Sequence, residues 1–228
     1  MPTFVLIHSP LVGPLTWALV ADELRRRGQE VLVPRLTDSP DASEPLWRQH
    51  VACVQAAAGL PAGEPLVIAG HSGAGWLLPA IGAALGRPVA AYLFVDAQLP
   101  LAAGEAPEPL PPEILQHFER GGRYPNWTDE QLRHEIPDAA LRTQLLRELQ
   151  PRGRDYFATP VPVPAGWPDA PAAYLRFSPH YAPQAERARA AGWPGRYLPG
   201  GHFQMLVEPD AVATALIELA EECRISGA

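Results

Sequence analysis

The chain has 228 residues, of which 47% are hydrophobic and 19% charged, and its formal net charge is −7. This balance is typical of one globular protein with a sizeable core and excludes an intrinsically disordered chain. The net negative charge argues against a nucleic-acid partner, and no apolar run reaches the roughly 18–20 residues of a membrane span. No basic leader precedes the first apolar run, so we expect no export signal and a cytoplasmic location.

All 18 basic residues are arginine, and the sequence contains no lysine. Schiff-base chemistry, a P-loop lysine and lysine-assisted proton transfer are therefore excluded. The abundance of alanine, proline and glycine suggests a bacterial source. Cys53 and Cys223 fall in helical patterns, and we expect both to be buried, reduced thiols. Because no His-Glu-x-x-His or paired-cysteine spacing occurs, we expect no metal and no cofactor.

Short apolar runs alternate with longer helical patterns along the chain. The runs are continuous, as expected for strands that helices cover on both faces. Strand–helix alternation of this kind predicts a doubly wound, mostly parallel α/β sheet. In chain order we expect a strand at Thr3–His8, a helix at Trp17–Gly28, a strand at Glu30–Pro34, a helix at Glu44–Gly59, a strand at Leu66–Ala69, a helix at Gly73–Gly86 and a strand at Val89–Asp96. After a different central region we expect a strand at Ala172–Phe177, a helix at Pro183–Gly192, a strand at Arg196–Leu198 and a helix at Pro209–Glu222.

The central region, residues 99–170, has proline clusters around three short helical patterns. Thr128 and Gln131 have the spacing of a capping box, and Asp138 is a suitable N-cap. We expect this region to form a small helical lid over the carboxyl edge of the sheet, and residues 1–98 and 171–228 to form the core. A flexible linker is the alternative. The three helices are expected over Pro112–Arg120, Thr128–Ile136 and Asp138–Leu149.

The most specific chemical signal is the run Gly70-His-Ser-Gly-Ala-Gly, where a predicted strand ends on glycines and a helix begins. A sharp strand-to-helix turn lifts the Ser72 side chain clear of the backbone. It also directs the first free N–H groups of the helix toward whatever that side chain attacks. These features favour Ser72 as a nucleophile, with an ordinary helix-capping serine as the alternative.

A serine hydroxyl is a weak nucleophile and needs a base within hydrogen-bond reach. The run Tyr197-Leu-Pro-Gly-Gly-His-Phe supplies a candidate at the end of the last predicted strand. A histidine after a glycine pair can reach over the sheet edge, so the spacing predicts His202 as the general base for Ser72.

These segments resemble the α/β-hydrolase superfamily, and the resemblance covers the whole chain. Its opening part is similar to the plant esterase and hydroxynitrile lyase branch. The chain starts at what would be the third strand of the family, so the resemblance implies a compact six-stranded sheet. It also implies a serine esterase or thioesterase that cleaves a carboxylic ester, thioester or lactone through an acyl-enzyme on Ser72. The resemblance rests on Phe4-Val-Leu-Ile-His-Ser-Pro, Gly70-His-Ser-Gly-Ala-Gly, Tyr92-Leu-Phe-Val-Asp-Ala and Gly200-Gly-His-Phe.

The family uses a third residue, an aspartate or glutamate that orients the histidine, and usually places it after the penultimate strand. Here that segment, Tyr174-Leu-Arg-Phe-Ser-Pro, has no carboxylate. Asp96 ends the preceding strand, which is an alternative location in such folds, and we expect it to orient His202. Glu186 and the absence of any carboxylate partner are the alternatives.

The oxyanion hole of the family takes one N–H from the residue after the nucleophile, here Gly73. The second N–H normally comes from the position of Pro10, and proline has none. We expect Leu11 to replace it, with the Ser9 hydroxyl or a single donor as alternatives. Losing one donor typically slows such reactions about 10²–10³-fold.

The substrate is expected to be a small, apolar-to-amphipathic acyl compound. Three other functions remain open: a cofactor-free lyase or cyclase that uses Ser72 and His202 as proton shuttles, a nucleotide-binding protein, and a degenerate hydrolase that only binds ligands. We expect the pocket to be lined by Ser9, Pro10, Trp76, Phe118 and Trp127.

Overall fold

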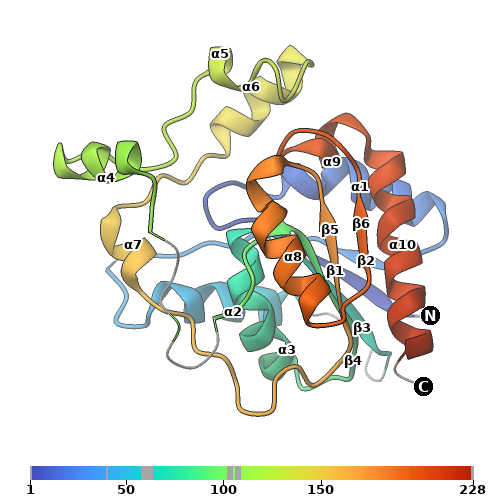
Figure 1. The fold of residues 1–228 in the computed structure, drawn as a ribbon. Coiled ribbons are helices and arrows are strands. Elements are labelled where there is room, and N and C mark those ends of the chain that lie inside the picture. Colours follow the sequence, from blue (N-terminus) through green and yellow to red (C-terminus); the bar gives the residue numbers. More distant parts are fainter. Residues whose placement is uncertain (1, 40, 58–63, 102–104, 106–108, 227–228) are drawn as a thin grey trace.

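The computed structural model describes residues 2–39, 41–57, 64–101, 105 and 109–226. Within these residues one parallel sheet has the order β2-β1-β3-β4-β5-β6, which confirms the predicted six-stranded, doubly wound fold (Figure 1). Every pair of neighbouring strands in this sheet is parallel. The strands are β1 (Thr3–Ile7), β2 (Val31–Leu32), β3 (Leu66–Ser72), β4 (Val89–Ala97), β5 (Ala172–Arg176) and β6 (Gly195–Tyr197).

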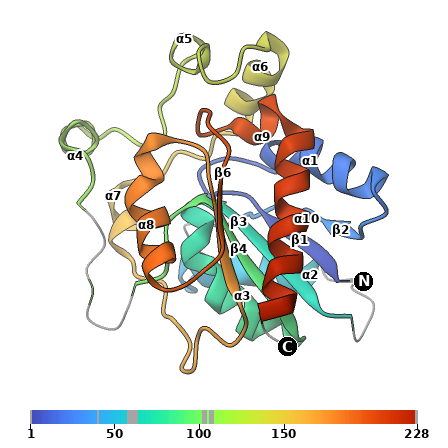
Figure 2. The ribbon, with the colours of Figure 1, turned by 45° about the vertical axis from the view of Figure 1, so that its right-hand side comes forward.

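Helices cover both faces of this sheet (Figures 1 and 2). Phe4 and Leu6 of β1 belong to the core on one face, and Val5 and Ile7 belong to the core on the other. Both faces of a strand are therefore apolar, which is why the runs in the sequence are continuous. One face packs against α1 (Leu15–Arg26) and α10 (Pro209–Ser226), and the other against α2 (Leu46–Ala56), α3 (Leu78–Leu85) and α8 (Ala182–Ala190). No helix in the described ranges is long and apolar enough to cross a membrane.

All the helices predicted for the core differ from the observed ones in their bounds. The helix expected over Gly73–Gly86 is divided into the 3-10 turn η1 (Gly73–Leu77) and α3. Pro79 lies in the first turn of α3, where its missing N–H leaves no helical bond unmade. The helix expected over Glu44–Gly59 corresponds to α2, and residues 58–59 lie outside the described residues.

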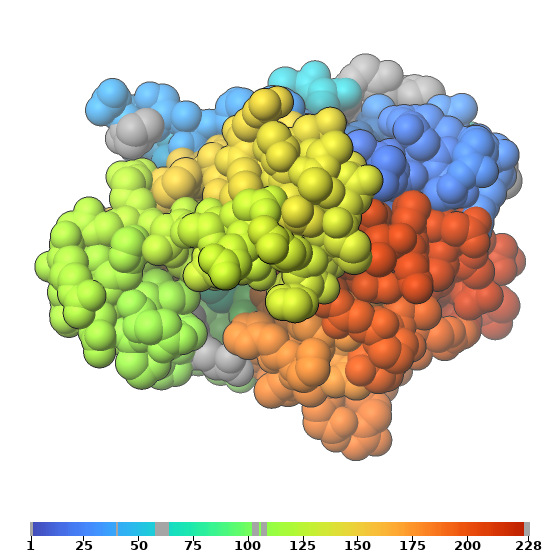
Figure 3. All heavy atoms as spheres, turned by 90° about the horizontal axis from the view of Figure 1, so that it is seen from above, coloured from blue at the N-terminus to red at the C-terminus, as the bar shows by residue number. Residues whose placement is uncertain are grey.

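The residues between β4 and β5, called the insert below, lie outside the layers of the sheet and cover one edge of it (Figures 1 and 3). The capping box at Thr128 is confirmed, since its side chain and that of Gln131 each accept a backbone N–H of the other. The Asp138 carboxylate caps the next helix by accepting the Leu141 N–H at 2.9 Å. The helix expected over Thr128–Ile136 corresponds to α5, which ends earlier, at Leu132, and α7 was not predicted. The insert contains α4 (Pro112–Glu119), α5 (Asp129–Leu132), α6 (Ala139–Arg147) and α7 (Arg154–Ala158).

The sheet has a bulge at the carboxyl end of β4. His71 of β3 pairs with Val95 and Ser72 pairs with Ala97, so Asp96 is an extra residue in β4. Its φ of +41° is unusual for a residue other than glycine. A bulge of this kind turns the side chain of the extra residue out of the sheet pattern.

Tyr174 of β5 completes the hydrogen bonds of the strand beside the bulge. Its hydroxyl donates to the Ala97 carbonyl oxygen at 2.6 Å and accepts the Ala97 N–H at 3.0 Å. Ala97 is fully buried, so both backbone groups need a partner within the protein.

We expect Tyr174→Phe to destabilise the protein by about 1–3 kcal/mol or more, because it leaves the buried N–H and carbonyl groups of Ala97 without partners. Urea unfolding measures the difference. Tyr197→Phe is the matched control, since Tyr197 is 49% exposed on β6 and its ring lies against Arg176. The control should change stability by less than about 0.5 kcal/mol. Equal losses in the two variants would contradict this account of the bulge.

Candidate functional site

Ser72 lies at the turn between β3 and η1 with φ +58° and ψ −127°. A serine with positive φ is strained, and such strain persists only where the surroundings fix the backbone. The glycines of the predicted motif account for the close packing here. A Cβ at Gly75 would overlap the carbonyl oxygen of Gln98, and one at Gly70 would press on the Leu78 side chain. The sequence pattern therefore matches a tight turn with a half-buried serine at its tip.

The His202 residue is held at three points. Its Nδ1 lies 2.7 Å from Oδ2 of Asp96. Its carbonyl oxygen accepts the Nε2–H of His71 at 2.9 Å, and its N–H donates to the Glu135 carboxylate of the insert at 3.1 Å. Burial and the neighbouring His202 hold the pKa of His71 well below its usual value, so His71 is a neutral donor. These contacts orient the imidazole from both the core and the insert.

Asp96 is completely buried and accepts four hydrogen bonds. Oδ1 accepts the N–H groups of Phe177 and Ser178, both at 2.9 Å. Oδ2 accepts the Ser178 hydroxyl and the His202 Nδ1–H, both at 2.7 Å. Burial works to raise the pKa of Asp96, but these donors outweigh it and the pKa lies below its usual value. Asp96 is therefore ionised opposite His202.

Glu186, the alternative acid, does not approach this site. It lies within α8, exposed, and its carboxylate pairs with Arg189 on the same helix. The segment after β5 supplies donors instead of an acid, since Phe177 and Ser178 bind the Asp96 carboxylate. Asp96 and the groups that donate to its carboxylate thus come from the ends of two neighbouring strands, β4 and β5.

Tyr181 is a site residue that the sequence analysis missed. Its hydroxyl lies 3.3 Å from Oγ of Ser72, and its ring stacks on the His202 ring at 5.2 Å with an interplanar angle of 13°. Within the described chain, the hydrogen bond of the Ser72 hydroxyl goes to this phenol. The position of Tyr181 just after β5 was the available signal, because the carboxyl ends of parallel strands share one edge.

The loop after β1 provides a second group beside Ser72. The Leu11 N–H, expected to face the substrate, donates to Oγ of Ser9 at 3.3 Å. Oγ of Ser9 in turn lies 3.6 Å from the position that a Cβ would take on Gly73. Gly73 is the first residue of η1, so its N–H has no partner within that turn. Pro10 does not line the cavity, and its ring contributes no donor.

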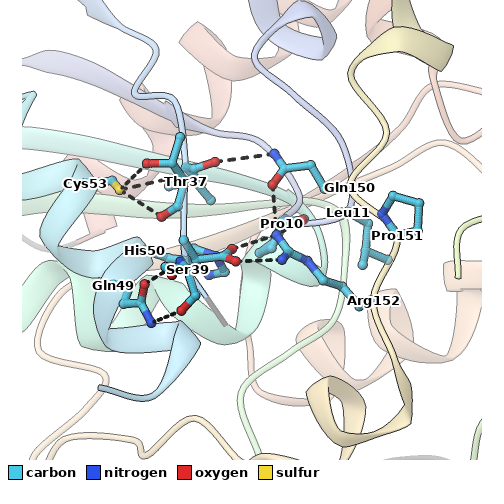
Figure 4. Close-up of polar contacts among 12 residues, drawn as sticks. Pro10, Leu11, Thr37, Ser39, Gln49, His50, Cys53, Gln150, Pro151 and Arg152 are labelled. Carbon is cyan, nitrogen blue, oxygen red and sulfur yellow. Dashed lines mark hydrogen bonds and ion pairs between the residues drawn. The ribbon is translucent and has the colours of Figure 1, made fainter. Parts of the chain in front are cut away.

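Residues of the insert hold this loop in place (Figure 4). An Arg152 Nη2–H donates to the Pro10 carbonyl oxygen at 3.2 Å. The Gln150 N–H donates to the Leu11 carbonyl oxygen at 2.9 Å, and its side-chain amide donates to that of Val12 at 3.0 Å. Three successive peptide groups are thereby fixed by one short segment of the insert.

His8 holds the same loop from the core side. Burial lowers its pKa to about 4, so the ring is neutral. Nδ1 donates to the Ser9 carbonyl oxygen at 2.8 Å, and Nε2 accepts the Leu36 N–H at 3.0 Å. Because these contacts occupy both ring nitrogens, His8 has a structural role.

Arg152 is anchored by a buried carboxylate. Two of its nitrogens lie 2.7 and 2.6 Å from the two oxygens of Asp38, and His50 of α2 lies 2.7 Å from one of those oxygens. Burial works to raise the pKa of Asp38, but the hydrogen bonds from Arg152 and His50 bring it below its usual value. Burial also lowers the pKa of His50. The cluster therefore pairs one cation with one anion.

A cavity of about 560 Å³ lies above Ser72 and His202, between the core and the insert. This volume suits a small ligand. Glu135 is the one carboxylate that faces it from the described residues, and no arginine of those residues does. Ser9, Leu11, Trp76 and Trp127 line it as expected. Phe118 of α4 does not, because it is buried and packs against Phe157.

Trp17 of α1 does not line the cavity, because it is fully buried in the core. Within the described chain, no three His, Cys, Asp or Glu side chains gather in a way that could hold a metal ion. Cys53 and Cys223 are both free, and Cys53 is only half-buried.

Comparison with known proteins agrees with this fold. A model of the alpha/beta hydrolase family matches residues 4–215. No curated protein matches the chain significantly. Similar solved structures share 12–20% identity with the chain and show the fold alone.

Three of those structures serve as examples. An extracellular alpha/beta-hydrolase from a Paenibacillus species, described as a structural and functional homologue of tobacco salicylic acid binding protein 2, has 18% identity and a TM-score of 0.68, covering 96% of this chain and 99% of its own. Polyneuridine aldehyde esterase has 15% identity and a TM-score of 0.71, covering 96% and 99%. The pyrethroid hydrolase PytH with BIF has 19% identity and a TM-score of 0.68, covering 96% and 98%.

We expect Arg152→Met to destabilise the protein by about 3–5 kcal/mol at pH 7, because it leaves the Asp38 carboxylate buried without its cation. Ionised Asp38 stabilises the native protein above its unfolded pKa of about 4, and this contribution is lost as the pH falls through its lowered native pKa. Without Arg152, burial raises that pKa, so the deficit of the variant should shrink as the pH falls from 7 to 5. Urea unfolding at both pH values measures it.

Arg142→Met is the matched control for this prediction. Arg142 is also a buried arginine of the insert, but its partner Asp129 is 43% exposed and keeps water when the cation is removed. Its deficit should be smaller and change less with pH. A deficit of Arg152→Met that is the same at pH 7 and pH 5 would refute a dominant role for Asp38 burial.

Proposed function

Because the chain belongs to the alpha/beta hydrolase family, we propose that it is a serine hydrolase that cleaves a carboxylic ester, thioester or lactone. The observation that carries the proposal is the 2.7 Å contact between His202 Nδ1 and the buried carboxylate of Asp96. Because Nδ1 donates to Asp96, Nε2 of His202 is free to accept a proton. The His202 ring lines the cavity together with Ser72. Ser72, His202 and Asp96 then act as nucleophile, general base and orienting acid.

In the first half of the reaction, Oγ of Ser72 attacks the substrate carbonyl carbon while Nε2 of His202 takes its proton. The positive charge on the imidazole is stabilised by ionised Asp96. When the tetrahedral intermediate collapses, the bond to the leaving group breaks and His202 returns the proton to it. In the second half, His202 activates a water that releases the acyl group from Ser72.

The oxyanion is proposed to bind the Gly73 N–H and the Ser9 hydroxyl. Oγ of Ser9 already accepts the Leu11 N–H, so its own proton is free to donate toward the space beside Gly73. Ser9 thereby replaces the N–H that Pro10 lacks, and Leu11 acts through Ser9. A preorganised donor pair of this kind is the main electrostatic contribution in acyl transfer.

The substrate is proposed to carry an apolar or amphipathic acyl group without a negative charge. Trp76 of the core and Trp127 of the insert form apolar walls of the cavity, and Glu135 would repel an anion there. The insert, residues 99–170, acts as the lid of this cavity over a core of residues 1–98 and 171–228. The aromatic walls exclude water from the reacting atoms.

A fluorophosphonate probe tests the activated serine. We expect it to label the wild-type protein and not Ser72→Ala, because only a deprotonated serine displaces the fluoride. Mass spectrometry of the labelled peptide measures this. Ser9→Ala should still be labelled, about 10²–10³-fold more slowly, as expected for the loss of one oxyanion donor. A wild-type protein that no concentration of probe labels would favour the lyase, cyclase or binding-only alternatives.

Asp96→Asn tests the acid. We expect the rate of labelling or of ester turnover to fall about 10²–10⁴-fold, because an asparagine at this position no longer holds His202 in the required tautomer. Glu186→Gln is the matched control and should stay within about twofold of the wild type, since Glu186 is exposed on α8. If the two variants behave alike, Asp96 is not the acid.

A further inference from the structure

Tyr181 occupies a place that the proposed reaction leaves unassigned. It ends η2 (Pro179–Tyr181), the short turn after β5, and its side chain is buried against the cavity. Its ring stacks on His202 and its hydroxyl reaches Oγ of Ser72 at 3.3 Å. One phenol therefore touches both groups that exchange a proton.

We propose that Tyr181 is a further catalytic residue, whose hydroxyl donates a hydrogen bond to the leaving-group oxygen of the substrate. This inference rests on the proposed hydrolase function. Once the substrate carbon is bonded to Oγ of Ser72, the other two oxygens on that carbon lie in the space around Oγ. The oxyanion takes the side of Gly73 and Ser9, whereas the leaving oxygen must face His202 to receive a proton. Tyr181 reaches Ser72 from the side of His202.

The Tyr181 hydroxyl is suited to donate and not to titrate. Burial raises its pKa to about 12, so the phenol keeps its proton at neutral pH. The Ser72 and Gln98 side chains both hydrogen-bond this hydroxyl. The phenolic O–H rotates about its C–O bond, so in the intermediate its proton is directed toward the substrate oxygen.

The proton balance of the step is simple. The bond from the acyl carbon to the leaving oxygen breaks, the proton on Nε2 of His202 moves to that oxygen, and Tyr181 keeps its own proton throughout. The hydrogen bond from Tyr181 strengthens as negative charge develops on the leaving oxygen, so it favours the transition state over the bound substrate. Its benefit should be largest for leaving groups that are strong bases.

The test uses phosphonate probes that share one alkyl group and differ in the group that Ser72 expels: fluoride, p-nitrophenoxide or phenoxide. Tyr181→Phe removes the hydroxyl and retains the ring on His202. We expect labelling with loss of phenoxide to slow about tenfold to a hundredfold, and labelling with loss of fluoride to slow less than about twofold. The p-nitrophenoxide probe should fall between them. A merely structural role of Tyr181 would slow all three labelling reactions equally.

Tyr124→Phe is the matched control. Tyr124 also lines the cavity, but it comes from the insert, and its ring packs on Trp127. Its three labelling rates should keep the wild-type ratios. Equal slowing of the three probes by Tyr181→Phe, or no slowing at all, would overturn the inference while leaving the hydrolase proposal intact. If the fluoride probe fails to label even the wild-type protein, the hydrolase proposal falls and the role of Tyr181 falls with it.

Discussion

The bulge at the end of β4 is the constraint on which the site depends. It turns the Asp96 side chain out of the strand pattern, toward the segment after β5 and toward His202. The positive φ of Asp96 has a cost, which is offset by four hydrogen bonds to its carboxylate and by the Tyr174 hydroxyl on Ala97. Without the extra residue, the acidic side chain would enter one of the two apolar cores that flank the sheet.

The site combines few charges with many oriented dipoles. His71 and Tyr181 are buried and neutral, and both contact His202, so the proposed proton transfer takes place beside groups that do not compete for the proton. Among the residues that the structure describes, Asp96 is the one ionised group in contact with the ring. The insert adds the Glu135 carboxylate on the His202 backbone, which couples the cover of the cavity to the orientation of the base. Such preorganisation lets a weak nucleophile react without rearranging solvent.

The sequence predicted the sheet well because the inner strands β1, β3, β4 and β5 are apolar on both faces and each is followed by a helical period. It also located Ser72 and His202 at one sheet edge, because glycine pairs mark where strands end. It favoured Asp96 as the acid but left Glu186 and the absence of any carboxylate partner as alternatives, since a bulge leaves no periodic trace in the sequence. Contacts of the insert could not be predicted for a similar reason. Which side chains of a proline-rich segment face the cavity depends on how it packs, so Phe118 was misplaced and Glu135 was not anticipated. Tyr181, which follows β5, was not anticipated either.

The clamp of Gln150 and Arg152 on the loop after β1 limits how the molecule can be rebuilt. The insert is joined to the core not only at its two chain crossings but also through hydrogen bonds to Pro10 and Leu11. A chimera that exchanges the insert for that of a relative therefore has a natural boundary before Gln150. Exchange of residues up to that point changes the walls of the cavity and the contacts of Glu135 and Glu148 with the core, whereas a longer exchange also removes the support of the loop that holds Ser9.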